Sequence, residues 1–234
     1  MESQIAIPQT QTQIQERISQ FFTRVYTWMA LGLTLTGAVA AYVAGNQAIL
    51  QALLGNQINF IILIVVTLGL VFAISGLINK ISAGTATALF LAYASLNGVL
   101  FSSIFLVYTG ESIAQVFFIT AGTFGAMSIY GFVTKRDLTK IGQLATMALF
   151  GLIIALVVNM FFKSPAFSYL ISFIGVAIFV GLTAYDTQKL KGMAVGVTEG
   201  TEAFAKGAII GALALYLDFI NLFLMLLRLF GRRR

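Results

Sequence analysis

Two of the eight acidic residues in this chain lie within long apolar runs, which makes them the residues best placed to do chemistry. Asp218 is near the middle of a run over residues 207–230, and Asp186 is at the end of a run over residues 167–187. An ionised carboxylate at the centre of a bilayer costs about 2.5–3.5 kcal/mol, so an intramembrane acid is a candidate functional residue. The other six fall in the tail or in loops, where solvated surface charge is expected: Glu2, Glu16, Glu111, Asp137, Glu199 and Glu202.

The residues around Asp218 place it on a small and polar helix face. The members of this face recur at spacings of three and four: Gly207, Gly211, Ala214, Asp218, Asn221 and Met225. Small residues let helices approach closely, so we expect this face to be buried between neighbours rather than exposed to lipid. Two structural roles remain open. Asp218 could be a protonated, hydrogen-bonded helix contact, and Asp186 could be an interfacial acid paired with Lys189 or Lys191.

The elements that must carry these acids are transmembrane helices. The chain has 234 residues, of which 59% are hydrophobic and 9% charged, whereas a soluble domain carries roughly 25% charged residues. The apolar residues come in runs of about 20, the length that a helix needs to cross roughly 30 Å of hydrocarbon. We therefore predict an all-α, polytopic membrane protein with a seven-helix bundle over residues 23–231. Its spans are predicted at residues 25–44, 58–78, 85–108, 113–133, 143–162, 167–187 and 207–230, between a polar tail over residues 1–22 and a basic tail over residues 232–234.

The Lys and Arg residues indicate how this bundle is oriented. Nine of them fall in the N-terminal tail and in alternate loops, and only Lys163 falls in the opposite loops: Arg17, Arg24, Lys80, Lys135, Arg136, Lys140, Lys189, Lys191 and Lys206. The positive-inside rule then predicts a cytoplasmic N-terminus. With seven spans the basic tail over residues 232–234 emerges outside, against the same rule. A re-entrant segment over residues 207–230 is the alternative, although an uninterrupted run of this length favours one helix.

Several function classes are excluded by the residues that the chain lacks. It has neither Cys nor His, so thiol nucleophiles, disulfides, imidazole bases and the usual zinc or haem ligands are absent. Intramembrane aspartyl proteolysis needs two aspartates on adjacent helices, and Tyr185 with Asp186 resembles half of that pattern. Asp218 lacks the preceding Gly-x-Gly of the other half. We therefore predict that the protein is not an enzyme and has no cofactor. The net charge of +6 lies at the ends of apolar runs and does not indicate nucleic acid.

Two stretches resemble the signatures of the Bax inhibitor family, also called transmembrane Bax inhibitor motif proteins. They are residues 180–190 (VGLTAYDTQKL) and residues 214–228 (ALYLDFINLFLMLLR). The similarity runs from about residue 20 to the C-terminus and is closest to the bacterial inner-membrane branch. This resemblance implies a seven-helix fold with the last helix at its centre, a place in the bacterial inner (plasma) membrane, and a pH-sensitive calcium leak.

The resemblance also assigns roles to residues. By motif match, the paired aspartates that sense pH and contact the ion are Asp186 and Asp218. Two carboxylates a few ångströms apart cannot both ionise cheaply, so the pair is expected to share a proton near neutrality. Calcium typically takes six to eight oxygens, so the pair is expected to form only a weak, transient calcium site. Supporting candidates are Tyr185, Asn221, Arg228 and Lys80, the last as an approximate substitute for the family's basic latch near the second span.

Our first functional hypothesis is a passive, pH-gated leak for calcium or other cations, with the lipid bilayer and the cations as its partners. The alternative is a non-conducting regulator that binds another membrane protein, such as a membrane protease. The tail or the longest predicted loop, from Gln188 to Lys206, would make that contact. This loop contains three glycines and is also the predicted mobile gate.

Overall fold

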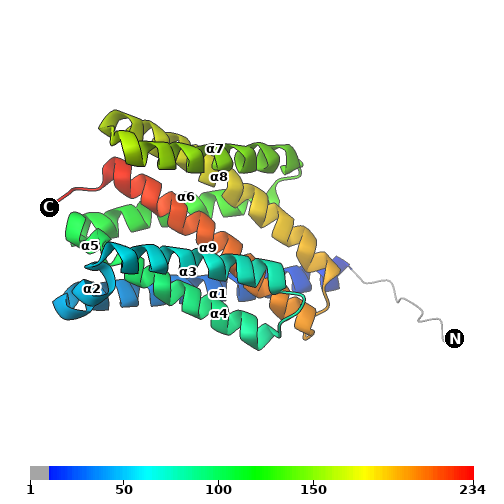
Figure 1. The fold of residues 1–234 in the computed structure, drawn as a ribbon. Helices are drawn as coiled ribbons and strands as arrows, with labels where there is room; N and C mark the ends of the chain where they lie inside the picture. The colour runs from blue at the N-terminus through cyan, green and yellow to red at the C-terminus, as the bar shows by residue number, and fades with distance from the viewer. Residues whose placement is uncertain (1–10) are drawn as a thin grey trace.

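Seven helices within residues 11–234, the part of the chain that the computed structural model describes, are long and apolar enough to cross a membrane. This confirms the predicted all-α fold and the number of spans. The elements, drawn in Figure 1, are α1 (Gln11–Gly45), α2 (Gln47–Leu54), α3 (Gln57–Leu77), α4 (Ala83–Phe101), α5 (Ile104–Val107), α6 (Gly110–Val133), α7 (Thr139–Phe162), α8 (Pro165–Gly196) and α9 (Glu202–Phe230). The third span comprises α4 and α5, and α2 is a short connection. Because α9 is one unbroken helix, the re-entrant alternative is wrong.

Helix ends on the N-terminal side of the bundle differ from the prediction. α8 continues to Gly196 and α9 begins at Glu202, so most of the predicted loop is helical and the connection is residues 197–201. The reason is that a helix need not end where the hydrocarbon ends. Polar turns continue into the aqueous layer, and Lys191 donates a 2.8 Å hydrogen bond to the Phe132 carbonyl there. The segment that was predicted to be a mobile gate is therefore reduced to the connection over residues 197–201.

The predicted N-terminal tail is also partly helical. α1 begins at Gln11, and residues 1–10 lie outside the described part of the chain. The amphipathic stretch before the first span buries Ile18, Phe21 and Phe22. Phe21 meets Phe204 of α9 edge to face, with ring centroids 5.3 Å apart. This contact explains why the helix starts well before its membrane-spanning part.

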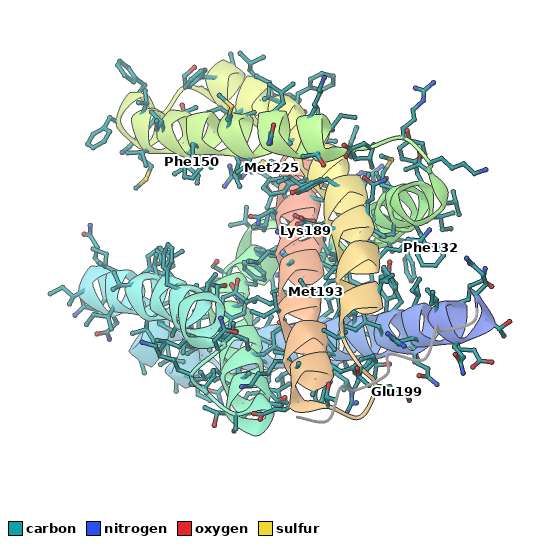
Figure 2. The ribbon with its side chains drawn as sticks, turned by 90° about the vertical axis from the view of Figure 1, so that its right-hand side faces the viewer. Phe132, Phe150, Lys189, Met193, Glu199 and Met225 are labelled. Atoms are coloured by element: carbon teal, nitrogen blue, oxygen red, sulfur yellow. The ribbon has the colours of Figure 1, made fainter. Side chains whose placement is uncertain are left out.

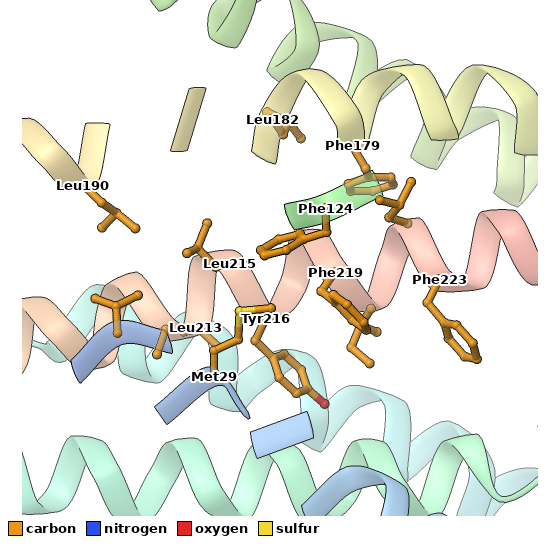
Figure 3. Close-up of a cluster of buried hydrophobic side chains, with 14 of the residues drawn as sticks. Met29, Phe124, Phe179, Leu182, Leu190, Leu213, Leu215, Tyr216, Phe219 and Phe223 are labelled. Atoms are coloured by element: carbon orange, nitrogen blue, oxygen red, sulfur yellow. The ribbon is translucent and has the colours of Figure 1, made fainter. Parts of the chain in front are cut away.

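The last helix lies at the centre of the bundle, as the family resemblance implies. In its most apolar window 72% of the residues are buried, against 11% in α3 and in α7. α9 packs against α1, α4, α6 and α8, and Figure 3 shows Leu213, Tyr216 and Phe219 of α9 among the buried side chains. The hydroxyl of Tyr216 is 2.7 Å from that of Thr36, which also donates to the carbonyl of Ala94, so one buried contact joins α1, α4 and α9.

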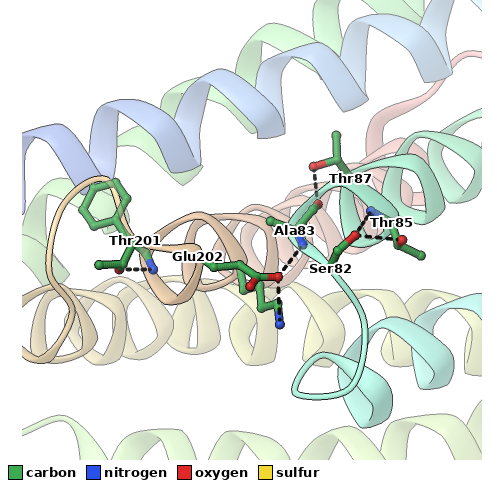
Figure 4. Close-up of polar contacts among 8 residues, drawn as sticks. Ser82, Ala83, Thr85, Thr87, Thr201 and Glu202 are labelled. Carbon is green, nitrogen blue, oxygen red and sulfur yellow. Dashed lines mark hydrogen bonds and ion pairs between the residues drawn. The ribbon is translucent and has the colours of Figure 1, made fainter.

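Polar contacts fix both ends of the bundle. On the N-terminal side, the Glu202 carboxylate accepts a 3.2 Å hydrogen bond from the backbone N–H of Ala83 and pairs with Lys206, also at 3.2 Å (Figure 4). On the opposite side, the segment after α9 runs antiparallel to residues 107–109. The N–H of Thr109 donates to the Arg232 carbonyl at 3.1 Å, and that of Arg234 donates to the Val107 carbonyl at 2.9 Å. The basic C-terminal tail is therefore held against the bundle.

Candidate functional site

Asp218 lies in the middle of the most buried helix. Only 4% of its surface is exposed, and its Oδ2 atom is buried without a hydrogen-bond partner within residues 11–234. The small face predicted from the sequence accounts for this burial. Gly211 lies two helical turns before Asp218, and an added Cβ at this glycine would lie 2.8 Å from the Leu190 side chain of α8. Small residues thus let α8 approach α9 on the helix face that carries Asp218.

Asp186 is brought to Asp218 by the packing of α8 on α9. It lies ten residues before the end of α8 at Gly196, which is about 15 Å along the helix axis. The two carboxyl groups are in direct side-chain contact, close enough to exchange a hydrogen bond. Two spans far apart in sequence therefore present one carboxyl pair inside the bundle.

A cavity of about 730 Å³ opens beside this pair. Its walls come from α3, α4, α7, α8 and α9. α3 packs on α2 and α4, and α7 packs on α8, so the cavity lies between two peripheral helices. Figure 2 views the bundle from the N-terminal side, and Lys189 and Met225, two of the lining residues, are labelled there. Most of the lining is aliphatic or aromatic, which leaves the carboxyl pair as its acidic feature. The other polar lining residues are Thr67, Tyr93, Asn97, Thr146, Tyr185, Lys189 and Asn221.

The supporting candidates are only partly brought together. Tyr185 and Asn221 line the cavity, although the Asn221 amide donates to the Leu217 carbonyl of its own helix at 2.8 Å. Arg228 lines a different pocket, at the far end of α9. Lys80 is exposed in the turn between α3 and α4 and does not line the cavity. The structure thus separates these two basic residues from the carboxyl pair.

The structure contradicts one of the two structural roles considered for the acids, the salt bridge of Asp186. The only ion pair within the described residues joins Lys206 to Glu202, so Asp186 has no salt bridge to Lys189 or Lys191. Lys191 instead donates to the Phe132 carbonyl and lies 4.8 Å from the centroid of that ring. Lys189 lies near enough for its charge to act on Asp186. Asp218 contacts Asp186, as a structural hydrogen bond would also require, and its Oδ2 atom has no hydrogen-bond partner within residues 11–234.

Several cavity residues were not predicted from the sequence. Tyr93 and Thr146 are the clearest examples, and each is a polar residue within an apolar run. Asn97 follows Tyr93 by four positions and donates a 3.3 Å hydrogen bond to its carbonyl. This spacing of polar residues was the available signal. It shows that they share a helix face, but not which other helix that face meets.

The site could hold a cation only weakly. Within residues 11–234 no group of three or more Asp, Glu, His or Cys residues could hold a metal ion. The two carboxyls, with hydroxyl and amide oxygens along the same cavity, supply fewer strong ligands than the six to eight oxygens of a calcium storage site. The arrangement suits proton exchange and a transient cation contact.

Comparison with known proteins gives full-length matches. The sequence profile of a family described as "Inhibitor of apoptosis-promoting Bax1" matches residues 18–234. The inner membrane protein YbhL of Escherichia coli K12 is 50% identical over 230 residues, covering 97% of this chain and 98% of that protein. An uncharacterized protein of Borreliella burgdorferi is 49% identical over 216 residues, covering 92% and 93% of the two chains. None of these matches indicates an enzymatic family.

Proposed function

Because the chain belongs to the Bax inhibitor family, we propose that it is a passive, pH-sensitive leak for calcium or similar cations. We place it in the bacterial inner membrane, where the name of its Escherichia coli relative places that protein. Asp186 and Asp218 act as both the pH sensor and the ion contact. Calcium is the cargo of this leak and not a resident metal.

The observation that carries the proposal is the contact between two carboxyl groups of α8 and α9 at a cavity that otherwise has a mostly apolar lining. Two charges about 4 Å apart repel by about 4 kcal/mol at an effective dielectric constant of 20. A pair that retains one proton avoids this repulsion. Retaining such a pair inside a membrane is costly, which supports a functional role.

The sign of the pH dependence follows from the charge in the cavity. A protonated pair is neutral and offers a cation little attraction, whereas a deprotonated pair places negative charge in an apolar cavity. The leak should therefore increase as the pH rises through the titration of the pair. The other charged or titratable groups that line the cavity are Lys189 and Tyr185 from α8 and Tyr93 from α4, and the lining residues of α3 and α7 are uncharged.

We further propose that the N-terminus is cytoplasmic. The basic residues of the N-terminal side outnumber those of the opposite loops, where Lys163 stands alone. In this orientation Asp186 is about 15 Å along α8 from that helix's cytoplasmic end. Cysteine labelling from either side of the membrane tests this, because the chain has no native Cys.

A flux measurement tests the leak. Purified protein is placed in liposomes that contain a calcium dye, and calcium entry is measured from about pH 5 to pH 8, a range that brackets a shared-proton carboxyl pair. We expect entry above that of empty vesicles, increasing with pH. Entry no faster than in empty vesicles at every pH would refute conduction. Recovery of one stoichiometric membrane partner by crosslinking would then favour the regulator hypothesis, for example the regulation of a membrane protease.

A further inference from the structure

A second pocket, at the end of α9 opposite to Glu202, gathers basic side chains. It has a volume of about 660 Å³ and lies between the end of α7, the start of α8, the end of α9 and the connection before α6. Its charged lining residues are Lys163, Arg228 and Arg233, and no carboxylate is among the described residues that line it. Tyr108 and Tyr169 belong to the same lining.

The three cations have no acidic partner within residues 11–234. The single ion pair in the described part of the chain lies at the other end of the bundle, between Lys206 and Glu202. Three positive charges around one pocket repel one another, and a bound anion would relieve this repulsion. The charge pattern therefore favours an anionic ligand.

Backbone and side-chain hydrogen bonds hold the elements around this pocket in place, so the pocket is preformed. Arg233 forms an isolated antiparallel bridge with Tyr108. The neighbouring backbone N–H of Arg232 donates to the Ser112 hydroxyl at 2.8 Å. The Tyr169 hydroxyl of α8 donates to the Leu229 carbonyl of α9 at 2.9 Å. A ligand that enters such a site orders little of the protein, which reduces the cost of binding.

α7 and α8 are tied together at the same level. The Asn159 amide of α7 donates to the Ser168 hydroxyl of α8 at 2.6 Å. Lys163 lies in the turn between them with a positive φ of 48°. It thus projects from a fixed turn and not from a long loop.

The position of the pocket in the bundle indicates an amphipathic ligand. α7 ends at Phe162 and α8 starts at Pro165, so the pocket lies where two spans leave the hydrocarbon. Phe161 and Phe162 next to it are 81% and 76% exposed, which leaves an apolar surface for lipid beside the pocket. Leu156 and Met160 extend the lining toward the hydrocarbon. A free anion would leave this apolar part of the pocket unfilled.

We propose that this pocket binds the phosphate group of an anionic phospholipid in the leaflet opposite to the N-terminus. The guanidinium groups of Arg228 and Arg233 and the ammonium group of Lys163 would contact the phosphate, because planar guanidinium groups match its oxygens in bidentate geometry. The acyl chains would lie along the exposed side of α7, which includes Ile153 and Val157. This site gives the basic C-terminus a role on the side where the positive-inside rule does not expect it.

Lipid titration followed by native mass spectrometry tests the proposal. The protein in detergent is titrated with phosphatidylglycerol and, separately, with phosphatidylcholine of the same chain length. We expect wild type to bind phosphatidylglycerol at least about tenfold more tightly. A variant with Lys163→Gln, Arg228→Gln and Arg233→Gln should lose this preference. No preference in wild type would overturn the proposal.

A matched variant controls for the loss of net charge. Lys135→Gln, Arg136→Gln and Lys140→Gln remove the same charge on the opposite side of the bundle and should leave the preference unchanged. Equal loss in both triple variants would indicate non-specific attraction and overturn the site. Displacement of phosphatidylglycerol by an equal concentration of inorganic phosphate would overturn the lipid assignment in favour of a free anion.

A single substitution keeps the test valid if the triple variant is not monodisperse. Arg233 is exposed, and its bridge to Tyr108 is a backbone interaction, so Arg233→Gln preserves the wall of the pocket. It should weaken phosphatidylglycerol binding by about threefold, the size of one exposed ion pair. Unchanged binding in this variant would contradict the assignment of Arg233.

Discussion

Gly131→Ala is expected to push α8 away from α6 next to the carboxyl pair. Gly131 of α6 faces the backbone of α8 at Ala184, two residues before Asp186. A Cβ at this position would overlap the Ala184 carbonyl oxygen and would lie 2.9 Å from the carbonyl carbon and 3.0 Å from Cα. Carbon atoms pack at about 3.5–4.0 Å, so the two helices must separate by roughly 0.5–1 Å. The neighbour is backbone and cannot rotate aside as a side chain can.

The cost of this substitution combines two opposing effects. Overpacking of this kind typically costs about 1–3 kcal/mol. Replacing a helical glycine by alanine contributes roughly 0.5–1 kcal/mol in the stabilising direction. We expect the free energy of unfolding of Gly131→Ala to fall by about 1–2 kcal/mol, which corresponds to a melting temperature a few degrees lower.

Thermal unfolding in detergent measures this difference. Gly125→Ala is the matched control, because Gly125 lies in the same helix and an added Cβ there meets nothing within 4 Å. The control should melt at or slightly above the wild-type temperature. If Gly131→Ala melts as high as Gly125→Ala, the close contact between α6 and α8 does not exist as described.

Two further predictions concern the aqueous ends of the helices. Glu202→Ala removes the acceptor for the Ala83 N–H (Figure 4), so hydrogen exchange at Ala83 should accelerate about two- to fivefold, whereas Glu199→Ala should leave it unchanged. Asp137 accepts hydrogen bonds from the Thr139 N–H at 2.9 Å and hydroxyl at 2.6 Å, and these bonds lower the pKa of the Asp137 carboxyl from its ordinary value of 3.8. This stabilising contribution is complete above that ordinary value and is lost as the pH falls through the lowered pKa. Protection of the first turn of α7 should therefore decline in acid below about pH 4 in wild type but stay flat in Asp137→Asn.

The spans could be predicted from the sequence because hydrocarbon thickness sets the length of an apolar run. The predicted second span at residues 58–78 compares with α3 at Gln57–Leu77. Helix ends in water were less predictable, because no such length constraint acts there. α8 continues through Lys189 and Lys191 to Gly196. The start of α1, before its membrane-spanning part, is also helical and packs Phe21 against Phe204 of α9.

Asp186 and Asp218 could be singled out as candidate site residues because charge is rare inside an apolar run. The periodic small face around Asp218 indicated that this acid is buried. The cavity could not be predicted, since its existence depends on which helices of the folded bundle leave a space between them. Its Thr67 comes from α3 and its Thr146 from α7, and no spacing within either helix indicates that they line one cavity. Arg228 illustrates the same limit. It shares α9 with Asp218, yet it lines the basic pocket at the other end.

The pH profile of calcium leak in liposomes containing wild type, Asp186→Asn or Asp218→Asn tests the central claim most directly. Each Asn keeps hydrogen-bonding capacity and removes one titrating group, so no pair remains to share a proton. Variants that remain monodisperse in detergent should both give flat profiles, whereas the wild-type leak should increase with pH. A wild-type profile in Asp218→Asn would contradict the account and leave Asp218 as a helix contact with no part in sensing pH.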